Sequence, residues 1–182
     1  MKYYVRLLWL MLTRRRRAPC PALGPCRTPF RVWPNDLDVF LHMNNGVYLT
    51  IADLGRMDML ARAGVLGEMN RRRWYPVVAA ESIRFRRSLR PWQRYAIDTR
   101  VLGWNERSIY IEQTFVADGE TVAHAVVDVR FLVRGGGGVT PAEVLDVLGG
   151  IAGVERGEPP ADALPGWVED WSGAMRRMSD RA

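Results

Sequence analysis

The segment from Asn45 to Ala63 constrains the fold more than any other part of this 182-residue chain. Apolar residues recur through it at helical spacing and spread over most of the circumference, which is typical of a helix buried on all sides. Asn44 or Asn45 stands where an N-cap is needed, and Gly64 stands where a helix commonly ends. The sequence therefore predicts one long internal helix, around which the rest of a small domain is arranged.

Five strand-like stretches accompany this helix. One precedes it and four follow it, after an arginine-rich loop at residues 71–73; the five are residues 27–33, 76–89, 95–104, 108–117 and 121–133. The last stretch alternates most clearly, and the short turns between the later stretches make neighbouring strands antiparallel. A sheet of about five strands must cover its apolar face, and only the long helix is large enough. The pattern predicts an α+β hot-dog domain, an antiparallel sheet wrapped around a long buried helix.

The hot-dog domain is expected to cover residues 27–148 and to follow a basic amphipathic segment with a proline-rich linker at residues 1–26. In that segment an apolar helical stripe precedes the run Arg14 to Arg17; the stripe consists of Tyr4, Leu7, Leu8, Met11 and Leu12. This pattern fits a helix lying on an anionic membrane and fits equally a helix docked on the domain itself. The apolar run is too short to span a bilayer, which takes about 20 residues.

Two further helices are predicted after the sheet. The run Thr140-Pro141-Ala142-Glu143 has a capping-box pattern and opens a helix that reaches Leu148. Residues 149–182 are expected to form a tail, loop-like up to residue 163, with a short helix docked by its aromatic edge; that helix is indicated by Trp167, Trp171 and Met175.

The charge composition narrows the classes of partner. The formal net charge is +6, with 26 Lys and Arg against 20 Asp and Glu. No helix-turn-helix, zinc-finger or RNP-like pattern accompanies this surplus, so nucleic-acid binding is not expected. Cys20 and Cys26 are expected to be two tail thiols without a role in a reducing cytosol, and the two histidines lie too far along the chain to complete a metal site.

The residues that carry chemistry gather in the turn before the long helix, from Asp36 to Tyr48. A helix N-terminus offers unpaired backbone N–H groups and partial positive charge, which can hold a carbonyl oxygen and stabilise the oxyanion formed on attack. A carboxylate just upstream can act as general base or nucleophile. The alternative is that Asp36, Asn44 and Asn45 only cap the helix and form the turn, with His42 a half-buried side chain.

The run DLDVFLHMNNGVYLTIADLGR resembles the signature of hot-dog acyl thioesterases. The likeness is to the branch of 4-hydroxybenzoyl-CoA thioesterase-like proteins, and the D-x-x-x-H-M-N-N core is shared with acyl-ACP thioesterases. The run SIRFRRSLRPWQRYAIDTRVLGWNERSIYIEQTF is similar to the second to fourth strands of that family, so the resemblance covers about residues 28–134. It implies an enzyme of lipid metabolism that hydrolyses acyl-CoA or acyl-ACP, without a metal and without a cofactor beyond the substrate's own carrier.

The resemblance also assigns catalytic roles residue by residue. Asp38 matches the acidic residue that serves as nucleophile or general base, and Asn45 falls where a backbone N–H polarises the thioester carbonyl. His42, Asn44 and Asn45 match the H-x-N-N run, whose members orient Asp38, position water or shape the turn. The 4-hydroxybenzoyl-CoA enzyme lacks this run, so the resemblance leaves the duty of Asp38 open between base and nucleophile.

Five residues around this core are expected to bind substrate: Asp36, Gly46, Tyr48, Arg84 and Arg86. Arg84 and Arg86 share one face of a strand, and the planar guanidinium fork suits the phosphates of CoA. A solvated basic strand face explains these two arginines equally well. Tyr48 and Met59 are expected to line the acyl pocket.

The family resemblance implies a homodimer, with sheets joined edge to edge, the long helices near the dyad and the active sites between subunits. Further pairing of dimers into tetramers is left open. The expected location is the cytoplasm, with peripheral contact at the inner membrane face through residues 1–17. The alternative function is an acyl-CoA-binding or membrane-associated accessory protein with little or no turnover, and a hot-dog dehydratase is a third interpretation that the motif spacing disfavours.

Overall fold

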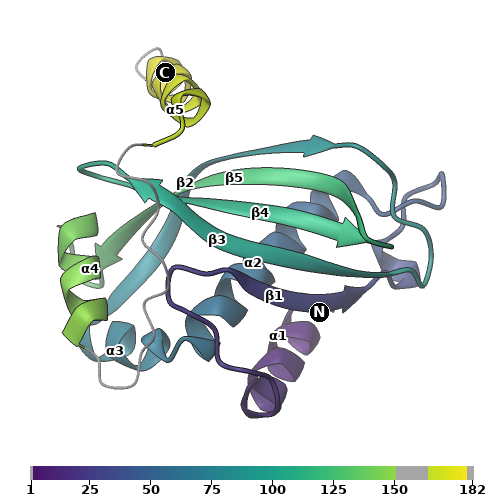
Figure 1. Cartoon of the computed structure of the whole chain (residues 1–182), viewed down its shortest axis with the longest axis horizontal. Coiled ribbons are helices and arrows are strands. Elements are labelled where there is room, and N and C mark those ends of the chain that lie inside the picture. Colours follow the sequence, from purple (N-terminus) through teal and green to yellow (C-terminus); the bar gives the residue numbers. More distant parts are fainter. Residues whose placement is uncertain (1, 151–163, 180–182) are drawn as a thin grey trace.

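A computed structural model describes residues 2–150 and 164–179 of the chain. Its strands are β1 (Cys26–Arg31), β2 (Trp74–Phe85), β3 (Arg94–Trp104), β4 (Ile109–Ala117), β5 (Glu120–Val133) and the short β6 (Gly138–Val139). They form one antiparallel sheet in the order β1-β3-β4-β5-β2, with β6 paired to β5. The sheet curls around helix α2 (Asn45–Arg62), as Figure 1 shows. The predicted hot-dog architecture is confirmed.

Helix α2 is buried along most of its length because the strands pack against it on one side and helix α1 (Lys2–Thr13) packs on another. Ala52 and Gly55 make one face of the helix slender, and this face accommodates Gln113 of β4. The Gln113 side-chain amide donates to the Ala52 carbonyl oxygen at 2.8 Å and to the Thr99 hydroxyl at 3.1 Å. A Cβ at Gly55 would lie 3.1 Å from that amide nitrogen, so a larger residue there would crowd this buried polar contact.

The arginine-rich stretch expected to be a loop is mostly helical. Gly64, in the left-handed region with φ of 78°, ends α2, and the chain immediately restarts as α3 (Val65–Arg72). Val65 and Met69 are buried beneath α3, while Glu68 pairs with Arg71 and Arg72 on its outer side. The prediction failed here because only two residues of this short helix are buried, which is too few to produce a visible apolar period.

Helix α1 is docked on the domain, and the docked face differs from the predicted stripe. Leu10 is fully buried and Leu7 and Met11 pack beside it, whereas Tyr4, Leu8 and Leu12 of the predicted stripe face outward. Arg6, which interrupts the apolar run in the sequence, lies on the docked face. The run of arginines after α1 forms the 3-10 helix η1 (Arg14–Arg16).

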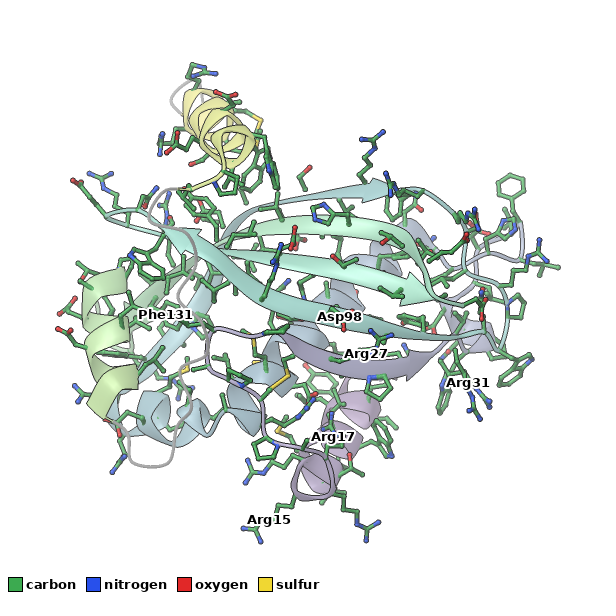
Figure 2. All side chains as sticks on the ribbon, in the orientation of Figure 1. Arg15, Arg17, Arg27, Arg31, Asp98 and Phe131 are labelled. Carbon is green, nitrogen blue, oxygen red and sulfur yellow. A yellow bond between two sulfur atoms is a disulfide. The ribbon has the colours of Figure 1, made fainter. Side chains whose placement is uncertain are left out.

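Polar contacts fix this docked helix to the rest of the domain. The Tyr3 hydroxyl donates to Asp53 of α2 at 2.6 Å, and Arg17 forms an ion pair with the fully buried Asp58 at 2.5 Å. In Figure 2, Arg15 extends outward from the end of α1, whereas Arg17 lies between that end and the domain. The N-terminal segment is therefore an integral layer over α2.

The two remaining helices lie after the sheet. The Thr140 hydroxyl and backbone amide both donate to the Glu143 carboxylate at 2.7 Å, which confirms the predicted capping box at the start of α4 (Pro141–Gly150). Helix α5 (Gly166–Ser179) lies over one end of the sheet (Figure 1), and its Ser172 hydroxyl bonds that of Tyr110 at 2.7 Å. It docks through Val168 and Ser172, while Trp167 stays half exposed. Residues 151–163 of the predicted loop lie outside the described residues.

None of the helices in the described part of the chain has both the length and the apolar character needed to cross a bilayer.

Cys20 and Cys26 are joined by a disulfide, with their Cα atoms 5.5 Å apart. Both side chains are buried and pack against Met59 of α2. The expectation of two tail thiols without a role is therefore wrong. The disulfide closes the loop that connects the docked N-terminal helix to β1.

Replacing both cysteines by serine should lower the free energy of unfolding by about 2 kcal/mol, because the disulfide restricts the unfolded chain even for a short loop. Urea denaturation of the oxidised wild type and the variant measures this difference. A phosphine reductant should produce the same loss in the wild type and no change in the variant. Equal stability of the reduced and oxidised wild type would contradict the prediction.

Candidate functional site

The D-x-x-x-H motif forms a closed turn between the 3-10 helix η2 (Pro34–Asp36) and α2. The Asp38 amide donates to the His42 carbonyl oxygen at 2.8 Å, and the Leu41 amide donates to the Asp38 carbonyl oxygen at 3.1 Å. Leu37 and Met43 bridge the two arms of the turn in antiparallel fashion. The spacing between Asp38 and His42 in the motif therefore matches the number of residues that this turn needs to close.

The Asp38 carboxylate is held by the backbone of its own turn. Its Oδ1 accepts hydrogen bonds from the Phe40 amide at 2.9 Å and the His42 amide at 3.2 Å. In the described part of the chain, no group binds its other oxygen, and the side chain is partly exposed. One carboxylate oxygen is therefore fixed by the turn, while the other has no partner among the described residues.

The start of α2 leaves a backbone donor free close by in the chain. Asn44 is the N-cap, and its side-chain oxygen accepts from the Gly46 amide at 2.9 Å. The Val47 amide donates to the Asn44 carbonyl oxygen at 2.9 Å. Within the described residues the Asn45 amide makes no hydrogen bond, so it remains available at the positive end of the helix.

His42 lies at the far end of the turn with an exposed ring. Its link to Asp38 runs through backbone atoms, because the His42 amide and carbonyl oxygen contact Asp38 and the ring makes no hydrogen bond to any described residue. The structure therefore brings Asp38, His42, Asn44 and Asn45 together on one exposed turn, with the imidazole directed to no partner among the residues it describes.

Asp36 lies two residues from Asp38 in a different environment. It is fully buried, pairs with Arg6 of α1 at 2.6 Å, and accepts from the Trp33 amide at 2.9 Å. Its backbone carbonyl oxygen also accepts from the Asn44 amide at 2.8 Å. This placement favours a structural role, in which Asp36 joins α1 to the turn, over the expected contact with substrate.

The other residues expected to bind substrate are dispersed. Gly46 is exposed in the first turn of α2, whereas Tyr48 is buried against Phe85 and Phe115 at ring distances of 5.0 and 5.2 Å. Burial raises the pKa of the Tyr48 hydroxyl, which accepts a hydrogen bond from the Leu89 amide. Arg84 is exposed at the end of β2 and Arg86 just beyond it, where both are open to solvent as a phosphate contact requires.

The site also contains a feature that the motif did not predict. Val39, Phe40 and Leu41 form the tip of the turn with 89%, 77% and 66% of their surfaces exposed. Leu41 has a φ of 59°, a conformation that bulky residues rarely adopt and that the closed turn imposes. Three consecutive exposed apolar side chains beside a polar site indicate a surface that meets another molecule. The sequence signal for this surface was the apolar run inside the D-x-x-x-H motif.

The model of the thioesterase-like superfamily matches residues 32–169, which is more than half of the chain. The chain belongs to the thioesterase-like superfamily. The matched region of this superfamily member contains the turn and all strands of the sheet except β1.

Two curated relatives carry the name Protein THEM6. The protein from Xenopus laevis is 41% identical over 104 residues, covering 57% of this chain and 50% of that protein. The protein from Danio rerio is 33% identical over 148 residues, covering 80% of this chain and 71% of that protein. The chain thus matches half the length of the Xenopus relative.

Solved structures share the fold. The YbaW probable thioesterase from Escherichia coli has a TM-score of 0.62 at 22% identity, covering 66% of this chain and 93% of that one. A thioesterase complexed with coenzyme A and Zn from Thermus thermophilus has a TM-score of 0.58 at 25% identity, covering 68% and 92%. This superfamily member therefore has the hot-dog fold of known thioesterase structures.

The different environments of the two aspartates predict different effects on stability. Asp36→Asn should lower the free energy of unfolding by about 3 kcal/mol, because it leaves Arg6 buried without its anionic partner. Asp38→Asn is the matched control and should change stability by less than about 1 kcal/mol, since an asparagine oxygen still accepts from the two turn amides. Urea denaturation measures both, and an unchanged midpoint for Asp36→Asn would refute the structural role.

Proposed function

We propose that this protein hydrolyses an acyl thioester to a free acid and a thiol, with Asp38 as general base or nucleophile. The observation that carries the proposal is the pairing of two groups on one turn. An Asp38 carboxylate oxygen and the Asn45 backbone amide are both without partners in the described residues, at the N-terminus of the central helix. Membership of the thioesterase-like superfamily supports the same chemistry.

The two groups supply complementary parts of the reaction. The thioester carbonyl oxygen accepts from the Asn45 amide, and the positive end of α2 stabilises the charge that develops on it. As base, Asp38 takes a proton from water while the water oxygen bonds to the carbonyl carbon. The C–S bond then breaks, and the proton passes to the departing thiolate. As nucleophile, Asp38 itself bonds to that carbon while the C–S bond breaks and the thiolate leaves, taking up a proton from solvent. Water then hydrolyses the resulting anhydride, which releases the free acid and restores the Asp38 carboxylate.

The rest of the motif supports this pair. The Asn44 side chain binds the Gly46 amide, so the helix cap leaves the Asn45 amide as the free donor. We assign the exposed His42 ring to binding water or the leaving thiol, since no described residue holds it.

Coenzyme A is the carrier that the surface favours over ACP. Arg84 and Arg86 place two exposed guanidinium groups at and just beyond the end of β2, where they suit the phosphates of a free nucleotide carrier. The related Thermus thermophilus thioesterase is named as a complex with coenzyme A, which supports a CoA thioester as the substrate.

A homodimer is part of the proposal. Strand β2 is twelve residues long, lies at an edge of the sheet, and exposes Val78 and Phe85. An edge of this length is a template for pairing with a second copy. The exposed tip formed by Val39, Phe40 and Leu41 gives the site turn an apolar surface that a partner subunit would cover.

Asp38→Asn should lower the kcat for acyl-CoA hydrolysis by about 10²- to 10⁴-fold, because it removes the base or nucleophile while keeping the turn. Release of free thiol from a panel of acyl-CoA esters, from acetyl to palmitoyl and including aromatic acyl groups, measures this loss. Asp146→Asn, an exposed charge change on α4, is the matched control and should keep full activity. Full turnover in Asp38→Asn would exclude the assigned role.

A second candidate function, an accessory protein held at a membrane, is favoured by the outer face of α1. The docked face of this helix already packs against the domain, yet a second set of apolar side chains faces outward. This outward stripe consists of Tyr4, Val5, Leu8, Trp9 and Leu12. The exposed arginines Arg14 to Arg16 follow directly, and residues 2–17 contain no acidic residue. An apolar stripe beside clustered cations fits the surface of an anionic bilayer, such as the inner face of a membrane seen from the cytoplasm.

Leu12→Glu should weaken binding to vesicles of phosphatidylcholine and phosphatidylglycerol by about tenfold or more, because a charge replaces an inserted leucine. Flotation of the full chain with these vesicles measures the bound fraction. Met178→Glu on α5 is the matched control, since Met178 is 65% exposed beside two arginines and Leu12 is 72% exposed. No flotation of the wild type, or equal loss in both variants, would reject the membrane surface.

A further inference from the structure

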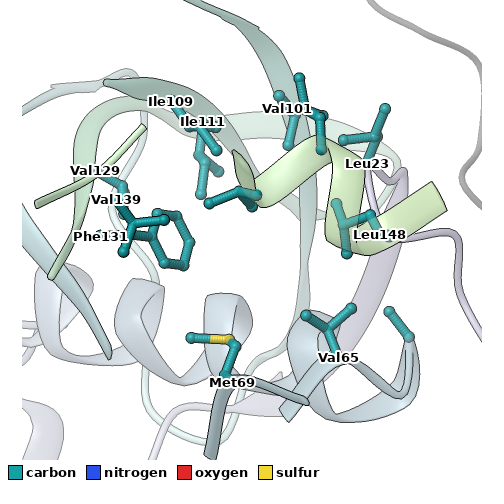
Figure 3. Close-up of a cluster of buried hydrophobic side chains, with 14 of the residues drawn as sticks. Leu23, Val65, Met69, Val101, Ile109, Ile111, Val129, Phe131, Val139 and Leu148 are labelled. Atoms are coloured by element: carbon teal, nitrogen blue, oxygen red, sulfur yellow. The ribbon is translucent and has the colours of Figure 1, made fainter. Parts of the chain in front are cut away.

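An apolar cavity of about 50 Å³ lies at the end of the domain opposite the site turn. It is enclosed by the C-terminal part of α2, by α3 and α4, and by the ends of β3, β4 and β5. In Figure 3 the side chains of Val65, Met69, Phe131 and Leu148 extend toward this space from different sides. The only charged residue in the lining, among the residues described, is Glu68, which pairs with Arg71 and Arg72.

A second cavity, of about 60 Å³, adjoins the first. The two share four lining residues, namely Met59, Leu60, Ile111 and Phe131. From this common wall the second cavity extends between α2 and β2 toward Val78, which is 44% exposed. The two cavities therefore lie in sequence along a path from the α2–β2 side of the domain to its interior, and the side chains that they share stand between them.

Such space is unusual in a folded core. Protein interiors are packed as densely as organic crystals, and unfilled volume costs stability. Cavities without polar partners stay dry and accept apolar guests. The polar groups at the outer end are already satisfied, because the Arg56 guanidinium donates to Gln113 at 2.7 Å and to Asp53 at 3.3 Å. Two adjoining cavities whose lining is mainly apolar are therefore better suited to a hydrocarbon than to water.

We propose that these two cavities hold the distal part of a long, unbranched aliphatic acyl chain; this inference rests on the proposed hydrolysis of an acyl thioester. Asp53, at the outer end of the path, follows Asn45 by eight residues, which is about 12 Å along a helix. A chain whose carbonyl lies at the Asn45 amide must cover that distance before it enters the cavities. Short acyl groups end before the entrance, and long ones reach the interior.

The lining also selects against polar acyl groups. An aromatic acyl group with a hydroxyl would bury that hydroxyl among apolar side chains without a hydrogen-bond partner, which is costly. Leu145 and Leu148 of α4 close the inner end of the path. The capping box at Thr140 and Glu143 fixes where this helix begins, so α4 sets the greatest chain length that the interior accepts.

The experiment combines substrate profiles with direct binding of free fatty acids to the full chain. Leu60→Trp places an indole at the wall shared by the cavities, and Leu148→Trp fills the inner end. Leu66→Trp on α3 is the matched control, because Leu66 packs on the same cluster without lining either cavity. Both blocking variants should lower kcat/KM for palmitoyl-CoA by about tenfold or more and leave hexanoyl-CoA within about twofold.

Calorimetric titration with hexanoic to hexadecanoic acid gives a readout that does not require turnover. The wild type, Leu66→Trp and Asp38→Asn should bind hexadecanoic acid more tightly than hexanoic acid, and Leu60→Trp and Leu148→Trp should lose that preference. Far-ultraviolet circular dichroism verifies that each variant is folded, and the wild-type chain-length series tests the proposal even where a variant does not fold. Absence of turnover with this binding pattern intact would reject the hydrolase and retain the acyl site. A wild type whose fatty-acid binding is independent of chain length would overturn the acyl site, whatever its activity.

Discussion

The burial of α2 along most of its length is the constraint on which the rest of the structure depends. A helix covered by a curled sheet on one side and by α1 on another can meet solvent or substrate mainly at its ends. At the C-terminal end, Gly64 redirects the chain into α3, which together with α4 closes the domain over an apolar interior. At the N-terminal end, the Asp38 turn leaves the first helical amide open. The fold thus leaves an open backbone donor of α2 beside the Asp38 turn.

Asp36 and Asp38, separated by one residue, have different environments at that open end of α2. Asp36 points into the protein and compensates Arg6, whose charge would otherwise be unpaired inside the layer between α1 and the turn. Asp38 points along the turn and keeps one oxygen free of any partner among the described residues. Because the Asp36 carbonyl oxygen also binds the Asn44 amide, the ion pair that anchors α1 fixes the helix cap as well. Docking of the N-terminal helix and geometry of the site are therefore coupled through one residue.

The sequence predicted the elements whose periodicity is strong and missed those fixed by single contacts. The α2 helix and all five long strands were predicted within a few residues, because burial imposes a clear apolar period on each. In the sequence Arg6 only interrupts an apolar run, because its buried partner Asp36 lies 30 residues away along the chain. The Cys20–Cys26 disulfide was missed because spacing in a proline-rich linker carries no information about distance in space. The motif placed Asp38 and Asn45 in the same turn and assigned Asp36 to substrate binding, and only the structure showed Asp36 buried against Arg6.

The separation between the site turn and the cavities gives α2 a second role, that of a spacer. A ligand that contacts both ends needs a polar, electrophilic head at Asn45 and an apolar tail long enough to pass Asp53, and a long-chain acyl thioester has this division. The same division connects the two candidate functions, because a long-chain substrate partitions into membranes and an α1 surface that lies on a bilayer would bring the site to it. One fold could then both hold an acyl chain in its interior and lie on a lipid surface through α1. Hydrolysis by Asp38 is the property that would distinguish an enzyme from an accessory protein.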